Sequence, residues 1–223
     1  MNRLGRLLRG LRGNASGVAM TEFALSLPFL MGVGMWGIES ANLAITNMRV
    51  SQLAMQIADN GSRIGDTSTL TNHRIYESDV NDLLLGANIM GGDTIDLFEH
   101  GRVIVSSLEV SEDGDQYIHW QRCKGKKDFS SAYGAEGAGL DGSLTGMGPP
   151  GDEVTAVEND AVIFVEISYD YQPLISSAFT NASTISATAA FNVRDDRDLS
   201  QIYQRDAGNP DAVAVCTTFD GYS

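Results

Sequence analysis

Residues 16–30 read SGVAMTEFALSLPFL, and this segment opens the apolar region around which the chain is organised. Residues 23–38 carry no charge, and Glu22 and Glu39 bound this run of sixteen positions. At about 1.5 Å per residue the run is short for a bilayer core that needs roughly twenty residues, so we expect residues 18–20 to help to span it. The segment therefore predicts a transmembrane helix near the N-terminus.

A basic leader precedes this segment. It contains four arginines and no acidic residue: Arg3, Arg6, Arg9 and Arg12. By the positive-inside rule, the leader stays in the cytoplasm and the chain after the helix is exported. A secretory signal peptide has a similar layout, but its cleavage site is missing, because Glu39 stands two positions before Ala41, where a small residue is required.

A cut in front of the apolar run is favoured at Gly17, since glycine lacks a Cβ and lets a protease approach the backbone closely. Gly17, followed by Glu22-Phe23 and then by Pro28 inside the apolar helix, resembles the prepilin signature. The likeness is greatest to the TadE-like pseudopilins of Flp (tight-adherence) pilus systems. It implies that a membrane prepilin peptidase cuts between Gly17 and Val18 and leaves the apolar helix on the mature protein.

The resemblance is strong over residues 16–39, and beyond them the order of elements agrees more than the residues do. It implies a minor pilin or pseudopilin that takes part in assembly of Flp pili and needs no cofactor. Its place would be the bacterial inner membrane, which it crosses once, with the C-terminal domain in the periplasm. Its partners would be the peptidase, other pilins or pseudopilins and the Tad pilus assembly machinery. The assembly residues would be Glu22, Phe23 and Pro28.

Glu22 lies at the edge of the apolar run, where an unpaired carboxylate costs several kcal/mol. Cleavage would create a new α-amino group at Val18, and in pilin filaments the amine of one subunit can neutralise the glutamate of a neighbour. The alternative is a glutamate that reaches the cytoplasmic interface and has no partner. The sequence leaves both interpretations open.

Composition argues against several classes of function. The chain has 15 basic and 29 acidic residues, a net charge of −14, and loss of the leader leaves 11 basic against 29 acidic residues, or −18. Such a domain repels nucleic acid. His73, His100 and His119 share no ligand spacing and no cysteine cluster exists, so we expect no metal site. The acidic stretch 112–115 lacks the oxygen spacing of a calcium loop and reads as a hairpin turn.

We expect an α+β fold in three parts: the leader 1–17, the helix and stem 18–64, and a β-rich domain 65–223. The stem carries an imperfect apolar stripe that packs either on the globular domain or on other pilin stems: Ile38, Ile45, Met48, Leu53, Ile57 and Ile64. A second helix begins near Ser78, which can cap it, and ends at Gly91-Gly92.

Six strands are expected from alternation and turn signals, at residues 94–98, 103–110, 116–122, 161–171, 184–193 and 212–215. The clean alternation in 161–171 and 184–193 predicts adjacent antiparallel strands. The glycine-rich residues 123–153 are too many for a simple connection, and we expect this loop to be mobile.

The two cysteines, Cys123 and Cys216, both lie after the helix, on the exported side. An oxidising compartment permits a disulfide, and two buried free thiols are the alternative.

Two rival functions share the same anchor. One is an uncleaved bitopic membrane-anchored adhesin or binding module, which cleavage at Gly17 would exclude. The other is a periplasmic hydrolase, but no Ser-His or Cys-His motif is apparent, so we expect no enzyme.

Overall fold

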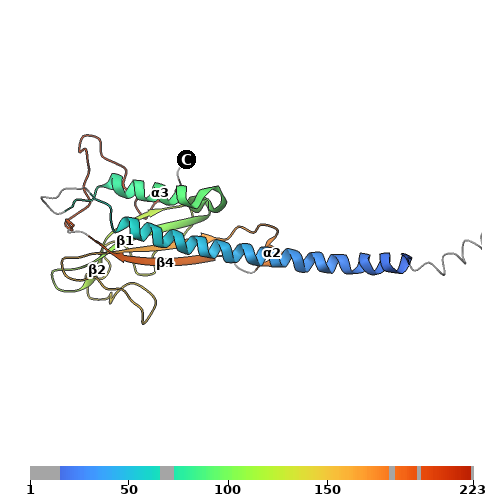
Figure 1. Cartoon of the computed structure of the whole chain (residues 1–223). Coiled ribbons are helices and arrows are strands. Elements are labelled where there is room, and N and C mark those ends of the chain that lie inside the picture. The colour runs from blue at the N-terminus through green and yellow to red at the C-terminus, as the bar shows by residue number, and fades with distance from the viewer. Residues whose placement is uncertain (1–15, 66–72, 181–183, 195–196, 222–223) are drawn as a thin grey trace, which may run out of the picture. The chain divides into compact units, whose positions relative to one another are not determined.

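A computed structural model describes residues 16–65, 73–180, 184–194 and 197–221. Most of the basic leader therefore lies outside the described residues. In chain order the elements are α2 (Ser16–Gly61), α3 (Glu77–Ile95), α4 (Leu97–His100), β1 (Gly101–Val110), β2 (Gln116–Lys124), β3 (Val162–Asp170), the 3-10 turn η1 (Ser177–Phe179) and β4 (Thr184–Asn192). Figure 1 shows the long helix and the sheet, which confirm the expected α+β fold.

The described residues form two compact units. Unit 1 contains residues 16–43 and 173–180, and unit 2 contains residues 44–172 together with the described residues from 184 onward. Helix α2 contributes its first half to unit 1 and its second half to unit 2. The units are treated separately below.

Unit 2 is built on a four-stranded antiparallel sheet in the order β2-β1-β3-β4. Strands β3 and β4 pair directly, as their alternation predicted, with Val165 opposite Ala189. Strands β1 and β2 form the expected hairpin across residues 111–115, where the Ser111 N–H donates to the Asp115 carbonyl at 2.8 Å. Gly114 adopts a φ of 90°, which glycine permits at no steric cost.

Helices cover one face of this sheet. The second half of α2 buries an apolar stripe at helical spacing: Val50, Leu53, Ala54, Ile57 and Ala58. A Cβ on Gly61 would lie 3.0 Å from Ile163 of β3 and 3.3 Å from Leu83 of α3, so helix, helix and strand meet there without room for a side chain. Of the expected stripe, Leu53 and Ile57 pack on the globular domain, whereas Ile45 and Met48 are 45% and 58% exposed and do not.

The glycine-rich loop covers the opposite face, where we had expected a mobile segment. Met147 is fully buried in a cluster with residues of three strands: Leu108, Ile118, Val162 and Phe164. The Tyr133 ring meets the Phe164 ring edge-on at 5.2 Å between centroids. Both faces of the sheet are thus covered, which explains why every residue of β1 except its last is buried.

Around α3 the structure corrects one predicted strand, the predicted end of the helix and its predicted cap. Residues 94–98 are helical except for Asp96, which joins α3 to α4 in the left-handed conformation (φ 44°). Helix α3 continues past Gly91-Gly92 to Ile95 because Gly92 takes a φ of 60° and absorbs a kink. The cap of α3 is Tyr76 rather than Ser78, and Asp79 accepts its backbone N–H at 3.1 Å.

Residues 212–215 form no strand, because the Val215 N–H turns back to the Val213 carbonyl at 2.9 Å; the Cys123 N–H of β2 donates to the Ala214 carbonyl at 2.8 Å. A disulfide joins Cys123 to Cys216 across 93 residues of sequence, with a Cα–Cα distance of 4.7 Å, and this confirms the expected pairing. Buried Arg102 donates to the carbonyls of Gly125, Cys216 and Thr218. The disulfide and the guanidinium together fix the C-terminal segment against the sheet.

Candidate functional site: the exposed apolar helix

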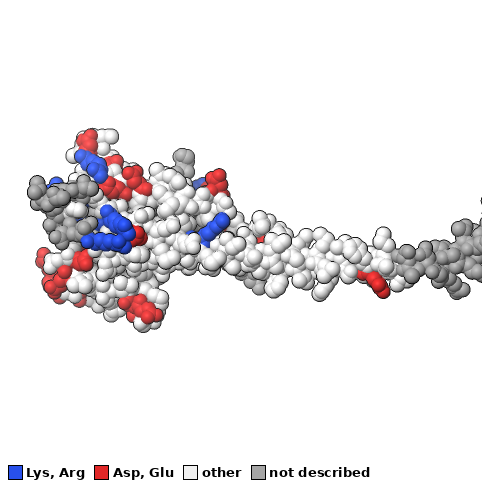
Figure 2. Space-filling view, viewed as in Figure 1, with Lys and Arg blue, Asp and Glu red and all other residues white. Residues whose placement is uncertain are grey.

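The first half of α2 is apolar and exposed. Leu25 is 80% exposed and Phe29 is 74% exposed, and the most hydropathic part of the helix has none of its residues buried. In Figure 2 this part of the chain is almost free of charged residues. Exposed apolar area on this scale marks an interaction or membrane surface, and the helix is long and apolar enough to cross a bilayer.

The hydroxyl groups of Thr21 and Ser26 in this half form hydrogen bonds within the helix. Thr21 Oγ1 donates to the Val18 carbonyl at 2.8 Å, and Ser26 Oγ donates to the Phe23 carbonyl at 3.1 Å. Such internal bonds remove the need for water around a hydroxyl group. Pro28 has no N–H and so removes one helical hydrogen bond, yet the helix continues through it. Membrane helices tolerate such a break more readily than helices in water do.

The residues expected at the processing and assembly site all lie in the first turns of α2. Gly17 and Val18 belong to the first turn, and a Cβ at Gly17 would meet nothing within 4 Å among the described residues. Glu22 follows Val18 by four positions, so both lie on one face of the helix. Within the described part of the chain, Glu22 is exposed and has no hydrogen bond or ion pair. Phe23 is 57% exposed and lies next to it.

In the sequence, Glu39 ends the apolar run and stands where a signal peptidase requires a small residue; the structure shows a further role for its carboxylate. Its carboxylate is fully buried and accepts the backbone N–H groups of Leu174 at 3.2 Å and Ile175 at 2.8 Å. These donors come from the loop between β3 and β4, and all three residues belong to unit 1. Glu39 therefore ties a distant loop to the apolar helix.

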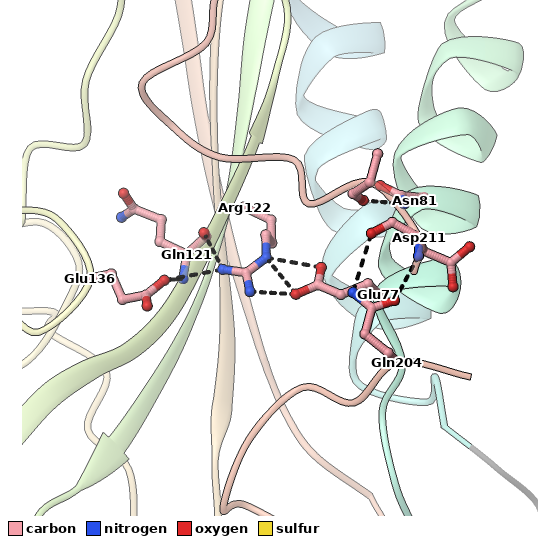
Figure 3. Close-up of polar contacts among 8 residues, drawn as sticks. Glu77, Asn81, Gln121, Arg122, Glu136, Gln204 and Asp211 are labelled. Atoms are coloured by element: carbon pink, nitrogen blue, oxygen red, sulfur yellow. Dashed lines mark hydrogen bonds and ion pairs between the residues drawn. The ribbon is translucent and has the colours of Figure 1, made fainter. Parts of the chain in front are cut away.

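Unit 2 contains an ion-pair network between its sheet and helix α3. Figure 3 shows Arg122 of β2 between two carboxylates, with its Nη2 2.6 Å from Glu77 Oε1 and its Nη1 3.1 Å from Glu136 Oε2. The Arg122 Nε also donates to Glu77, so the contact is bidentate. Glu77 opens α3, so this network positions the helix on the sheet and is a structural contact.

A second cluster brings a serine, a glutamate and a histidine together. Glu109 accepts a hydrogen bond from Ser107 Oγ at 2.7 Å and lies 2.8 Å from His119 Nδ1. The bond to Glu109 raises the pKa of His119, against the effect of burial, which lowers it. The serine donates to the carboxylate and not to the imidazole, whereas a nucleophile requires the base as its partner. The cluster is arranged as a buried polar contact.

Among the residues the structure describes, no group of three or more His, Cys, Asp or Glu side chains is placed to hold a metal ion. Comparison of the chain with protein-family models, with curated proteins and with solved structures finds no match in any of the three. The exposed apolar half of α2 is thus the feature from which a function is argued.

Proposed function

We propose that this chain is a TadE-like minor pilin or pseudopilin that takes part in assembly of Flp pili after cleavage by a prepilin peptidase. The observation that carries the proposal is an exposed apolar helix with Gly17 at its start and Glu22 one turn inside it. In this proposal α2 anchors the protein in the bacterial inner membrane, with the leader in the cytoplasm. Unit 2 folds in the periplasm, where an oxidising environment suits the Cys123–Cys216 disulfide.

The helix start supports a cut after Gly17. A peptidase needs an extended backbone at the scissile bond, so the first turn of α2 has to open locally. Glycine lowers the helix propensity there by about 1 kcal/mol relative to alanine, and helix ends fray readily. Gly17 also leaves open space beside the backbone, since no described atom lies within 4 Å of a Cβ placed there.

Assembly would use the apolar surface of the same helix, with Phe23 and Pro28 in contact with neighbouring pilin helices. Glu22 has no partner within the described residues, and the amine that cleavage creates at Val18 of a neighbouring subunit would supply one. The resulting ion pair would set the register between two helices in a medium of low polarity, where unpaired charges are costly. No catalysis is required of the protein in this role.

Processing tests the proposal directly. The protein is expressed in cells that contain the prepilin peptidase, and the mass of the membrane-bound form is measured. We expect a mature chain that begins at Val18, and we expect Gly17→Ala and Gly17→Val to retain the long form. Gly32→Ala is the matched control, because Gly32 has the same open surroundings in the same helix.

The open space around Gly17 makes this experiment decisive, since a methyl group there disturbs no contact of the described fold. Loss of cleavage in Gly17→Ala with normal cleavage in Gly32→Ala therefore reports recognition by the peptidase. A chain that still begins at Met1 in these cells contradicts the proposal. In that case the uncleaved membrane-anchored binding module becomes the better explanation.

A further inference from the structure

The loop that Glu39 holds presents apolar side chains to solvent. Leu174 is 66% exposed and Ile175 is 39% exposed, although their backbone N–H groups are fixed by the buried carboxylate. The loop is also ordered internally, because Ser176 Oγ accepts the Ala178 N–H at the start of η1. The loop therefore exposes two apolar side chains while Glu39 holds its backbone in place.

The charge pattern of this region differs from that of the rest of the chain. Residues 171–193 include no Asp, Glu, Lys or Arg, in a protein with a net charge of −14. The acidic surface elsewhere is repelled by anionic lipid headgroups, and burial of an acid in the interface carries a desolvation penalty. The uncharged loop avoids both effects. It is suited to contact with lipid in a way that the acidic loops are not.

The length of the helix sets the depth at which the loop lies. Residues 18–39 comprise 22 positions, which at about 1.5 Å each extend roughly 33 Å, close to the thickness of about 30 Å of a bilayer core. A helix with Val18 at the cytoplasmic boundary thus brings Glu39 to the opposite boundary. The two backbone donors replace the water that this carboxylate would otherwise need there.

We propose that the Glu39-held loop, with Leu174 and Ile175 at its tip, inserts into the outer lipid–water interface of the membrane that α2 spans. The inference rests on the proposed membrane anchor and adds a second lipid contact, far from α2 in sequence. The loop and the helix both belong to unit 1, and the hydrogen bonds to Glu39 join the two lipid contacts. Its ligand is the zwitterionic headgroup and upper acyl region of the bilayer, reached by apolar insertion.

A single introduced thiol tests this depth. Both native cysteines are engaged in the disulfide, so Leu174→Cys provides one reactive site in the full chain. The thiol is labelled with an environment-sensitive fluorophore, and the protein is reconstituted in phosphatidylcholine vesicles. Some of the lipids carry a nitroxide quencher, either near the headgroup or near the end of the acyl chain. We expect blue-shifted emission that the shallow quencher suppresses and the deep quencher leaves largely unchanged.

Two controls separate this inference from the anchor on which it rests. Leu30→Cys, 60% exposed in α2, reports the bilayer interior and should respond to the deep quencher. Val157→Cys is matched to Leu174, with the same 66% exposure, but it is followed by Glu158 and should respond to neither quencher. If Leu30 is quenched while Leu174 behaves like Val157, the loop inference is overturned and the anchor stands. If the Leu30 label is not quenched either, both fail.

A second variant tests whether the hydrogen bonds to Glu39 position the loop. In Glu39→Ala combined with Leu174→Cys, loss of the carboxylate should release the loop and abolish shallow quenching, while the label at Leu30 in the same background keeps its deep quenching. Retained shallow quenching would show that the loop finds lipid without Glu39 and would overturn the positional argument. A further outcome is that the emission of the Leu174 label shifts only at high protein density and responds to neither quencher. This result would mean that a second copy of the chain covers the loop, and it would overturn the proposal.

Discussion

The two halves of helix α2 share one continuous backbone, but their leucines differ in solvent exposure. Leu25 is 80% exposed in unit 1, whereas Leu53 is 4% exposed in unit 2. In the second half, buried positions recur at helical spacing and polar residues such as Gln52 and Gln56 occupy the outer face. A helix with one apolar face packs on a core, whereas one that is apolar on every side needs an apolar surrounding. The first half has no such surrounding among the described residues.

This difference separates anchoring from folding within one element. Substitutions in the first half should change insertion, processing or association and leave the stability of unit 2 intact. Substitutions in the second half should change the free energy of unfolding and leave the membrane contact intact. The following predictions test this separation, beginning with the largest expected effect.

Glu22→Ala should have the largest effect, and it should appear in assembly alone. If Glu22 pairs with the amine of a neighbouring subunit, its removal leaves a positive charge unpaired near hydrocarbon, and breaking one side of a buried pair costs about 3–5 kcal/mol. Association then falls by orders of magnitude. We expect the variant to be made, exported and cleaved, yet to fail in crosslinking to its pilin partners and in surface piliation.

The matched control is Thr21→Ala, in the same turn, because the Thr21 hydroxyl bonds only to its own helix at Val18. It should assemble normally. Normal crosslinking and normal pili in Glu22→Ala would leave Glu22 as an interfacial residue without a partner and would remove the main physical argument for assembly through this helix.

The same substitution at Leu53 and at Leu25 should give opposite results. Leu53→Ala leaves a cavity beside α3 and should lower the free energy of unfolding of unit 2 by about 2–5 kcal/mol. Leu25→Ala should change it by less than about 0.5 kcal/mol, as is usual at exposed sites. Denaturation of the full chain in detergent, followed by near-ultraviolet circular dichroism of buried Trp120, measures both. Equal losses would mean that the two halves are not separate.

The sequence was sufficient for the elements with long, strong patterns. The strands at 103–110, 161–171 and 184–193 and the helix after Ser78 agree with β1, β3, β4 and α3 to within a few residues. The prediction for residues 94–98 was wrong because their alternation is brief, and Ile95, Leu97 and Phe98 are buried although the segment is helical. The left-handed Asp96 between two helical segments carries no signal of that kind.

The sequence pattern did not predict which face of the stem helix is buried, nor which residues Glu39 contacts. Helix α2 carries two rows of apolar residues, and the large exposed pair Ile45 and Met48 outweighed small buried residues such as Ala54. The partners of Glu39 lie 135 and 136 positions later in the chain. A single acid after an apolar run gives no indication of so distant a partner. The absence of charge from residues 171–193 is the one sign of this loop that the sequence contains.

The smallest expected effect is a pH dependence confined to unit 2, centred on His119. The hydrogen bond to Glu109 raises the pKa of His119 in the folded protein above its ordinary value of 6.5. A histidine with a raised folded pKa stabilises the fold fully below its unfolded pKa, and this contribution is lost as the pH rises through the folded pKa. His119→Asn should therefore destabilise unit 2 on the order of 1 kcal/mol at a pH of about 5.5 and by less at a pH of about 8.5.

Urea denaturation of the full chain at the two pH values measures the difference, and Glu109→Gln supplies the matched control, since it removes the charge that holds the proton on His119. In the Glu109→Gln background, His119→Asn should lose its pH dependence, because the coupling between the two side chains is then absent. The apolar half of α2 has no part in this contact, so cleavage at Gly17 and insertion should be the same in all three variants. An equal loss of stability at both pH values would show that His119 contributes only packing. A change in processing or insertion would show that the two regions are coupled and would contradict their separation.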